Sequence, residues 1–289
     1  MEYNKRMKKF ISTIILILLT FPAVFATNGN DVIGARSLAL GGFSTTLSDV
    51  WSTNNNQAGL GFLTDVSGGI SYESRFLLKE TAYKSGAFAL PTKLGAFGLS
   101  VTSFGYSAYN ETKAGLSYGQ KLNEKIALGV QLNYVNIKLE QDYGQKSALT
   151  GAIGLIMNLS KEIAVGVHVY NPTRTKFADY NNERLSTIMK LGLDYKFSEK
   201  VFLAVETEKD INFGAIARVG IEYNPIDILY LRGGISTNPT LSSFGFGLKM
   251  KDFKLDLSTS FHQTLGITPG ISIVYQKDHS AKKVVNTNL

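Results

Sequence analysis

The residues that could do chemistry are few and lie far apart along the chain. The histidines are His168, His262 and His279, and the chain has no cysteine. Their spacing does not match a zinc-binding helix, and the sequence has no phosphate-binding loop or nucleophile-elbow motif. Ser260 and His262 share one face of an alternating segment, but no third residue is placed to orient the histidine for nucleophilic catalysis. We therefore predict no catalytic residue, no metal site and no cofactor.

A second set of candidates consists of charged residues at alternate positions in apolar segments. Across one short turn Lys190 should face Glu208, and Glu206 should lie at the depth of Arg218 on the next segment. Such charges have two interpretations: a salt-bridge network that fills an interior, or a polar path for a solute. The predicted network comprises Lys190, Glu206, Glu208, Arg218, Glu222 and Arg232.

The elements that must position these charges are β-strands. Fourteen stretches of apolar and polar alternation run from about Ser67 to Gln276, each closed by a turn signal. In a strand, successive side chains point to opposite faces, so each stretch has one apolar face and one polar or small face. An even strand count with alternating short and long connections is typical of outer-membrane barrels. A soluble β-sandwich, with the two faces exchanged, is the alternative.

The start of the chain favours export. A basic stretch (Lys5 to Lys9), an apolar run (Phe10 to Phe25) and a small-residue cleavage pattern predict a signal peptide over 1–26. An uncleaved anchor is the alternative, although the run is shorter than the roughly 20 residues of a spanning helix. Residues 1–26 hold four of the 30 basic and one of the 23 acidic residues, so the remaining chain carries +4. This mild, scattered charge argues against nucleic acid as a partner.

We accordingly predict an all-β fold: a 14-stranded antiparallel transmembrane β-barrel over 67–277, preceded by an irregular, short-helical segment (27–66) and followed by a polar C-terminal tail (278–289). Leu203, Val219, Leu255 and Ile271 should face lipid. Tyr195, Phe197, Tyr223 and Tyr275 should form an aromatic girdle near the short turns. In the strand over 126–139 the apolar face changes after Tyr134, which predicts either a β-bulge there or a strand end covered by protein on both faces.

Residues 27–66 do not alternate, and they contain the only tryptophan, Trp51. Their apolar residues argue against the alternative of a disordered leader. We expect Trp51 to lie at or inside the periplasmic mouth of the barrel, and Asn54 to Asn56 to cap the turn into the first strand.

The same segment carries a family resemblance. The motif residues are Gly34, Ala35, Arg36, Ser37, Leu40, Gly41, Gly42, Asp49, Trp51, Asn56, Gln57, Ala58, Gly59 and Leu60. This pattern resembles the opening of the PorV/PorQ-type outer-membrane proteins of the type IX secretion system of Bacteroidota, within the wider superfamily of FadL-like barrels. In that superfamily an Asn-Pro-Ala-Gly-Leu element follows an acidic residue, and here Gln57 replaces the proline. Its N-terminal segment folds into the lumen of a 14-stranded barrel, so the resemblance implies that residues 27–66 form a plug in the lumen.

Three functions remain open. The resemblance implies a non-enzymatic accessory barrel in the bacterial outer membrane, which would hold a secretion-system or surface protein partner. The first alternative is a FadL-like passive channel for small hydrophobic molecules, with such a molecule as its ligand. The second is a plugged structural barrel. The charged interior and short loops argue against the channel, whereas a continuous apolar tunnel or an opening in the wall would favour it.

Overall fold

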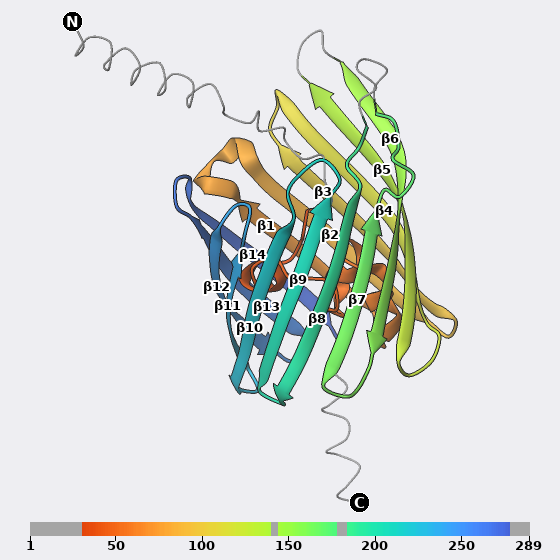
Figure 1. Cartoon of the computed structure of the whole chain (residues 1–289), viewed down its shortest axis with the longest axis vertical. Helices are drawn as coiled ribbons and strands as arrows, with labels where there is room; N and C mark the ends of the chain where they lie inside the picture. Colours follow the sequence, from red (N-terminus) through yellow and green to blue (C-terminus); the bar gives the residue numbers. More distant parts are fainter. Residues whose placement is uncertain (1–30, 140–143, 178–183, 278–289) are drawn as a thin grey trace, which may run out of the picture.

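The strands close into one antiparallel barrel, so the predicted fold class is confirmed (Figure 1). The computed structural model describes residues 31–139, 144–177 and 184–277. The strands are β1 (Ser67–Ser74), β2 (Ala82–Thr92), β3 (Gly95–Gly105), β4 (Tyr109–Lys121), β5 (Ile126–Leu139), β6 (Gln145–Asn158), β7 (Ile163–Tyr170), β8 (Ile188–Ser198), β9 (Val201–Asp210), β10 (Ile216–Ile226), β11 (Leu229–Ser236), β12 (Leu241–Met250), β13 (Phe253–His262) and β14 (Gly266–Gln276). The predicted signal peptide and the whole predicted C-terminal tail (278–289) lie outside the described residues. No helix in the described part of the chain is long and apolar enough to span a membrane.

The barrel closes because each strand pairs with its sequence neighbours and β1 pairs with β14, from Ser67 opposite Gln276 to Glu73 opposite Gly270. Connections at one end are tight turns of two to four residues, such as Lys93–Leu94 and Lys251–Asp252. The opposite end carries the longer connections, including the segment 171–187 between β7 and β8. We call these the turn end and the loop end. The turn end is the lower one in Figure 1.

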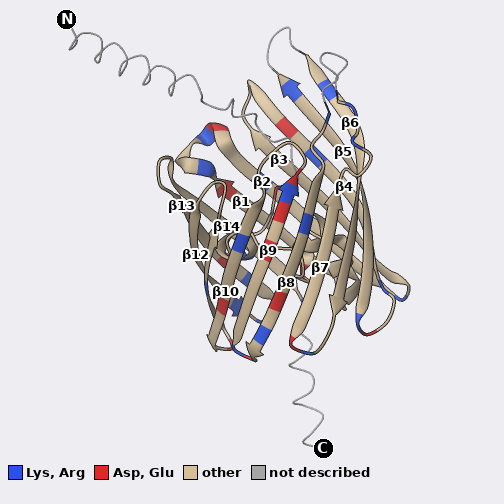
Figure 2. Ribbon diagram, viewed as in Figure 1, with Lys and Arg blue, Asp and Glu red and all other residues tan. Residues whose placement is uncertain are grey.

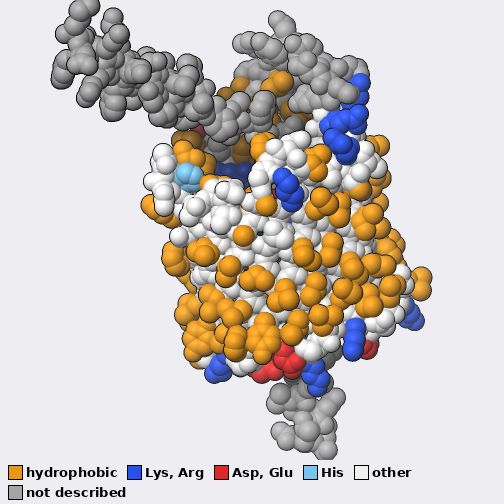
Figure 3. Space-filling model, in the orientation of Figure 1, with side chains coloured by type: hydrophobic (Ala, Val, Ile, Leu, Met, Phe, Trp, Pro, Cys, Tyr) orange, Lys and Arg blue, Asp and Glu red, His pale blue; other side chains and the backbone are white. Residues whose placement is uncertain are grey.

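The alternation sorts side chains as expected from strand geometry. Val219 and Ile271 lie exposed on the outer face, whereas Glu206, Glu222 and Asp256 are buried inside. Figure 3 shows the resulting apolar band on the face of the wall in view. Aromatic pairs lie near the turn end, with ring centroids 4.7 Å apart for Tyr195 and Phe197 and 5.3 Å apart for Phe253 and Tyr275. A wall that is apolar outside and polar inside is suited to a lipid bilayer.

The predicted bulge near Tyr134 is absent. β5 pairs without interruption with β4, from Ala127 to Leu139, and with β6, from Ile126 to Lys138. Tyr134 points outward, while Val135 and Ile137 are buried in the lumen. The alternative of a strand end covered on both faces also fails, because Tyr134 is exposed. The apparent change of face arises because this part of the lumen wall is itself apolar.

The segment that precedes β1 lies inside the barrel, drawn in red to orange in Figure 1. It forms a short helix α2 (Ala35–Ala39) and two 3-10 helices, η1 (Val50–Thr53) and η2 (Gln57–Phe62). Two further 3-10 turns, η3 (Arg75–Leu77) and η4 (Lys79–Thr81), belong to the loop between β1 and β2. Most of the segment is buried, including Phe43, Val50 and Leu60. We refer to the described residues 31–66 as the plug.

Candidate functional site

The first half of the resembling motif folds into a helix that ends abruptly. Gly34 precedes α2 with φ 96°, and a Cβ atom there would lie 2.6 Å from the Trp51 ring. After the helix, Gly41 and Gly42 both adopt positive φ, which glycine reaches at little cost. The backbone N–H of Gly42 donates to the carbonyl of Ser37 at 2.9 Å, which closes the helix end. The glycines therefore shape the plug and bring it against the wall, since a Cβ at Gly41 would lie 2.8 Å from the carbonyl oxygen of Ile235.

The second half of the motif forms two capped turns. The Asp49 carboxylate accepts from the N–H of Trp51 at 2.9 Å, and Ser52 completes a capping box with the N–H of Asp49. Asn56 caps η2 by accepting from the N–H of Ala58 at 3.2 Å. Burial raises the pKa of Asp49, which Arg36 only partly offsets. These caps explain why the polar residues of the motif lie where they do.

Of the asparagine cluster, only Asn56 has the expected role, since it caps η2, the last helical turn before β1. Asn55 instead accepts from the N–H of Ile33 at 3.0 Å and donates to its carbonyl at 2.9 Å. Asn54 donates to the carbonyl of Asp31 at 2.9 Å. The cluster therefore joins the beginning of the plug to its middle, a contact across more than 20 residues that the local sequence does not reveal.

Gln57, where the family pattern has proline, is the first residue of η2. Proline suits that position because the first helical N–H has no partner within the helix. The Gln57 side chain instead donates to the carbonyl of Asn54 at 3.2 Å and to the Gln131 side chain on β5 at 2.9 Å. The departure from the pattern therefore keeps the turn and adds a bond to the wall.

On one side the plug contacts a charged wall formed by β8 to β13. Arg36 makes two hydrogen bonds to the Glu222 carboxylate, at 3.0 and 2.9 Å. Glu222 also accepts from Arg232 at 2.6 Å, and Arg232 donates to Asp256 at 2.7 Å. The plug helix is thereby attached to an ion-pair chain that crosses β10, β11 and β13.

A second ion-pair group lies closer to the loop end. Glu206 accepts from the backbone N–H groups of Ser44 and Thr45, at 3.0 and 2.9 Å, and from the Thr45 hydroxyl. The same carboxylate pairs with Arg218 at 3.0 Å. Arg218 also contacts Glu208 at 2.9 Å, and Lys190 lies 3.2 Å from Glu208. The six charged residues singled out in the sequence therefore form two groups, and each group holds a different part of the plug.

On the opposite side, the wall of β3 to β7 contacts the plug without ion pairs among the contacts described. Gln131 donates to the carbonyl of Thr53 at 2.7 Å. Wall glycines leave room for the plug backbone: a Cβ at Gly129 would lie 2.2 Å from the Gln57 carbonyl carbon, and one at Gly119 2.3 Å from its oxygen.

Trp51, buried to 1% exposure, packs with Ile33, Leu60 and Val274 in an apolar cluster near the turn end. Its position in the mouth region follows from the cavity that it shares with Lys251 and Asp252 of the β12–β13 turn.

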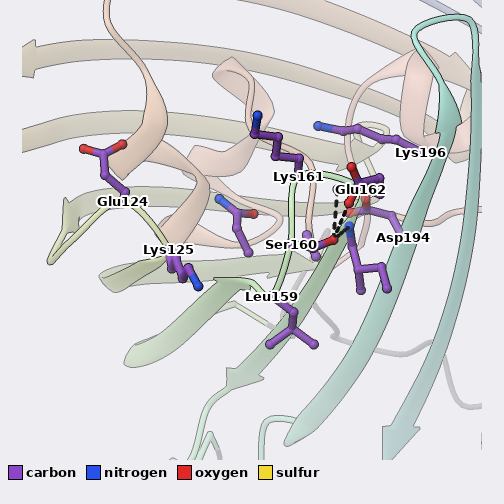
Figure 4. Close-up of a pocket in the computed structure, with 11 residues that line it drawn as sticks. Glu124, Lys125, Leu159, Ser160, Lys161, Glu162, Asp194 and Lys196 are labelled. Carbon is purple, nitrogen blue, oxygen red and sulfur yellow. Dashed lines mark hydrogen bonds between the residues drawn. The ribbon is translucent and has the colours of Figure 1, made fainter.

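Cavities lie on both sides of the plug. Two open toward the loop end, of about 520 Å³ and 320 Å³, and both are lined by Asp31, Val32, Ile216 and Arg218. Two lie at the turn end, of about 420 Å³ beside Trp51 and about 470 Å³ beside Asp194 and the β6–β7 turn, the latter shown in Figure 4. We call the two loop-end cavities the outer cavities and the two turn-end cavities the inner cavities. No residue lines both an outer and an inner cavity. Within the described residues the plug thus separates two sets of cavities.

The mouth of the barrel at the loop end holds a charged cluster that the sequence did not predict. Arg75 pairs with Glu73 at 3.0 Å and with Asp31 at 3.4 Å. Its guanidinium also lies over the rings of Tyr83 and Phe104, 5.1 and 5.4 Å from their centroids. The cluster ties the beginning of the plug to the loop between β1 and β2. From the sequence, only Glu73 could be expected to point into the lumen, from its position in an alternating strand. Asp31 belongs to a segment that does not alternate, so its approach to Arg75 could not be predicted.

The residues first considered for chemistry are dispersed. Ser260 forms a hydrogen bond with Ser243 at 2.8 Å, and His262 accepts from the N–H groups of Thr264 and Leu265, each at 3.1 Å. His168 is fully buried on β7. No three His, Asp or Glu side chains gather as a metal site within the described part of the chain. His279 lies outside the described residues.

Comparison with solved structures gives the fold a clear context. No family model and no curated protein matches the chain. A monoaromatic hydrocarbon channel, CymD, superposes with a TM-score of 0.67 at 14% identity, covering 88% of this chain and 100% of that one. The P. putida toluene transporter TodX gives 0.67 at 14% identity, covering 86% and 99%. A Pseudomonas aeruginosa FadL homologue gives 0.61 at 10% identity, covering 88% and 99%.

The chain has the fold of the FadL-like outer-membrane channels. At these identities the likeness establishes architecture alone. CymD is described as a channel and TodX as a transporter. The narrower resemblance to PorV/PorQ-type proteins has no counterpart among these structures.

Proposed function

We propose that the chain is a FadL-like passive outer-membrane channel for small hydrophobic molecules. The observation that carries the proposal is a plugged barrel of the hydrocarbon-channel fold with a cavity of about 320 Å³ on the loop-end side of its plug. Leu38, Phe76 and Leu241 supply apolar lining to this cavity, beside charged Arg75 and Arg218. Ligand pockets for small molecules begin at about this volume, and most combine apolar walls with a few polar groups. The cavity would be the first binding site of an entering molecule.

Passage beyond this cavity requires movement of the plug. All fourteen strands are paired in continuous registers apart from shifts at Tyr223–Ile226 and Lys196–Ser198, both near the turn end. The wall thus offers no side opening along the paired segments of the strands, although Gln145 to Gly151 of β6 extend beyond β7 at the loop end. A charged, hydrogen-bonded plug that separates outer and inner cavities is consistent with a channel that opens only during transport.

Uptake measurements with a blocked cavity test this proposal. In cells that express the protein as the tested entry route, we expect faster uptake of radiolabelled toluene than in cells with an empty vector. Leu241→Trp should fill the outer cavity and return uptake to the background. Phe244→Trp on the lipid-facing side of the same strand is the matched control and should leave uptake unchanged. Uptake equal to that of the empty vector, with folded protein in the membrane, would exclude the channel.

An accessory role of the PorV/PorQ type is the second candidate. It is favoured by an apolar edge at the loop end, where Leu77 is 59% and Leu78 51% exposed. Such an edge could contact a secretion-system or surface protein. Co-purification of crosslinked partners from native outer membranes, compared between the wild type and Leu77→Ser/Leu78→Ser, tests this role. If neither uptake nor a partner is found, the plugged structural barrel remains.

A further inference from the structure

The charges on the outer face of the wall are distributed unevenly. In the described strands, the side chains that point outward include three charged ones, and all are lysines: Lys84 on β2, Lys138 on β5 and Lys209 on β9. Each lies at the loop end of its strand. The connections carry both signs at both ends (Figure 2), as with Glu124 and Lys125 at the turn end and Lys79 and Glu80 at the loop end. On the face seen in Figure 3, basic side chains lie above the apolar band and both signs lie below it.

Two of these lysines flank a continuous row of polar side chains on the outer face. The strand registers place Lys84 opposite Ser103, Ser103 opposite Thr112, Thr112 opposite Asn136, and Asn136 opposite Ser147. Lys138 lies one outward position further along β5, opposite Asn110. We call this set, Lys84, Ser103, Asn110, Thr112, Asn136, Lys138 and Ser147, the polar shelf.

Hydrogen bonds hold the shelf together. Asn110 donates to the Ser103 hydroxyl at 3.1 Å, and Thr112 donates to Asn110 at 2.9 Å. Asn136 donates to the Ser147 hydroxyl at 2.8 Å. Both lysines are exposed. The shelf therefore offers hydroxyl and amide groups, linked by hydrogen bonds, beside two exposed ammonium groups.

An apolar band lies directly below. The second outward row below the shelf consists of Phe88, Leu99, Leu116 and Leu132. These residues again lie opposite each other in register, and all four are exposed. They are four residues along the strands from the shelf, which is roughly 13 Å at the rise of a β-strand. Polar groups above an apolar surface match a lipid with its head on the shelf and its acyl chains on the band.

We propose that the polar shelf binds the head of a phosphorylated glycolipid in the outer leaflet, with phosphates on Lys84 and Lys138 and sugar hydroxyls on the amide and hydroxyl side chains between them. Lysine is a suitable point charge for phosphate. β2 and β5 are three strand spacings apart, roughly 14 Å, so the two lysines suit a disaccharide that carries a phosphate at each end better than a single phosphate. The site is independent of whether the barrel transports anything.

Lipid retention tests the proposal. The protein would be reconstituted in phospholipid vesicles that contain a small fraction of bisphosphorylated lipid A, extracted, and analysed for bound lipid by mass spectrometry. The double variant Lys84→Gln/Lys138→Gln should retain about 10- to 30-fold less lipid A than the wild type. Lys209→Gln, which removes the outward lysine that lies outside the shelf, is the matched control and should match the wild type. The heat-modifiable gel shift of a folded barrel verifies folding of each variant.

A second arm uses the wild type alone and does not depend on the variants folding. Lipid A from which both phosphates have been removed should be retained about 10-fold less than the bisphosphorylated form. Equal retention of the two lipids would overturn the proposal. So would equal retention by the double variant and the wild type, or an equal loss in Lys209→Gln, which would indicate a general charge effect rather than a site.

Discussion

The two sides of the plug are held by different chemistry. Toward β8–β13, Arg36, Ser44 and Thr45 contact carboxylates that belong to ion-pair groups in the wall. Toward β3–β7, the plug meets amide groups and glycines, such as Gln131 and Gly129. A buried carboxylate that loses its partners costs several kcal/mol, whereas a neutral hydrogen bond contributes about 1 kcal/mol net. The charged side should therefore be more sensitive to loss of a side chain. Added volume at a wall glycine should disturb the plug on both sides, since a Cβ at Gly234 of β11 would also lie 2.2 Å from the backbone nitrogen of Gly41.

Trp51 allows this difference to be measured. It is the only tryptophan of the chain and is buried in the plug. An indole in an apolar cluster emits at shorter wavelength and is shielded from aqueous quenchers. Acrylamide quenching of Trp51 against urea concentration therefore reports release of the plug, while the gel shift of the folded barrel reports the wall separately.

Loss of Glu206 should have the largest effect. Its side chain is fully buried and is bonded to Ser44, Thr45 and Arg218. Glu206→Ala leaves Arg218 with only part of its partner set and two backbone N–H groups without an acceptor, so plug release should become easier by about 3–5 kcal/mol. The measurement is the urea dependence of Trp51 quenching. Glu199→Ala, in the exposed β8–β9 turn, is the control; a similar small change in both variants would contradict a charged anchor.

Added volume should also displace the plug on the neutral side, at the wall of β3 to β7. A Cβ at Gly129 would lie within 2.3 Å of the backbone of Gln57 and Ala58. Gly129→Ala should therefore displace η2 and weaken plug retention by about 1–3 kcal/mol. Gly86→Ala has no atom within 4 Å of the new Cβ and should change retention little. If the urea dependence of Trp51 quenching is the same in Gly129→Ala as in the wild type, η2 does not lie against the wall at Gly129.

Glu206 and Gly129 also show how much of the site could be predicted from the sequence. Alternation and short turns fix strand register, so the pairing of Lys190 with Glu208 and the depth of Glu206 followed from the sequence. The bonds from Glu206 to Ser44 and Thr45 span 162 and 161 residues and depend on the irregular path of the plug, which no periodicity describes. Which glycines of β3–β7 leave room for the plug depends on the same irregular path, so periodicity does not single out Gly119 or Gly129.

The neutral side should also respond to loss of its amide bonds, by a smaller amount. Gln131 donates to the carbonyl of Thr53 and accepts from Gln57. Gln131→Leu leaves the Thr53 carbonyl without this bond and Gln57 with only its bond to the Asn54 carbonyl, and it should ease plug release by about 1–2 kcal/mol. Gln120→Leu, on the outward face of β4, serves as the control in the same quenching titration. An effect as large as that of Glu206→Ala would remove the proposed difference between the two sides.

The smallest effect is expected at Asp49, a carboxylate of the charged side that also caps η1. It lies 3.7 Å from Arg36, and burial raises its pKa. Asn caps a helix about as well as Asp, so Asp49→Asn should change plug retention at neutral pH by less than about 0.5 kcal/mol, whereas Asp49→Ala should cost about 1 kcal/mol.

The two Asp49 variants should also differ from the wild type in pH dependence. With its pKa higher in the folded state than in the unfolded state, Asp49 contributes most to stability below the unfolded pKa. That contribution is lost as pH rises through the folded pKa. The quenching midpoint of the wild type, compared with that of Asp49→Asn, should therefore fall as pH rises above the ordinary carboxyl range. A difference that stays constant with pH, or rises, would mean that Arg36 rather than burial determines the charge of Asp49. The charged side would then be held more tightly at this position than its 3.7 Å separation suggests.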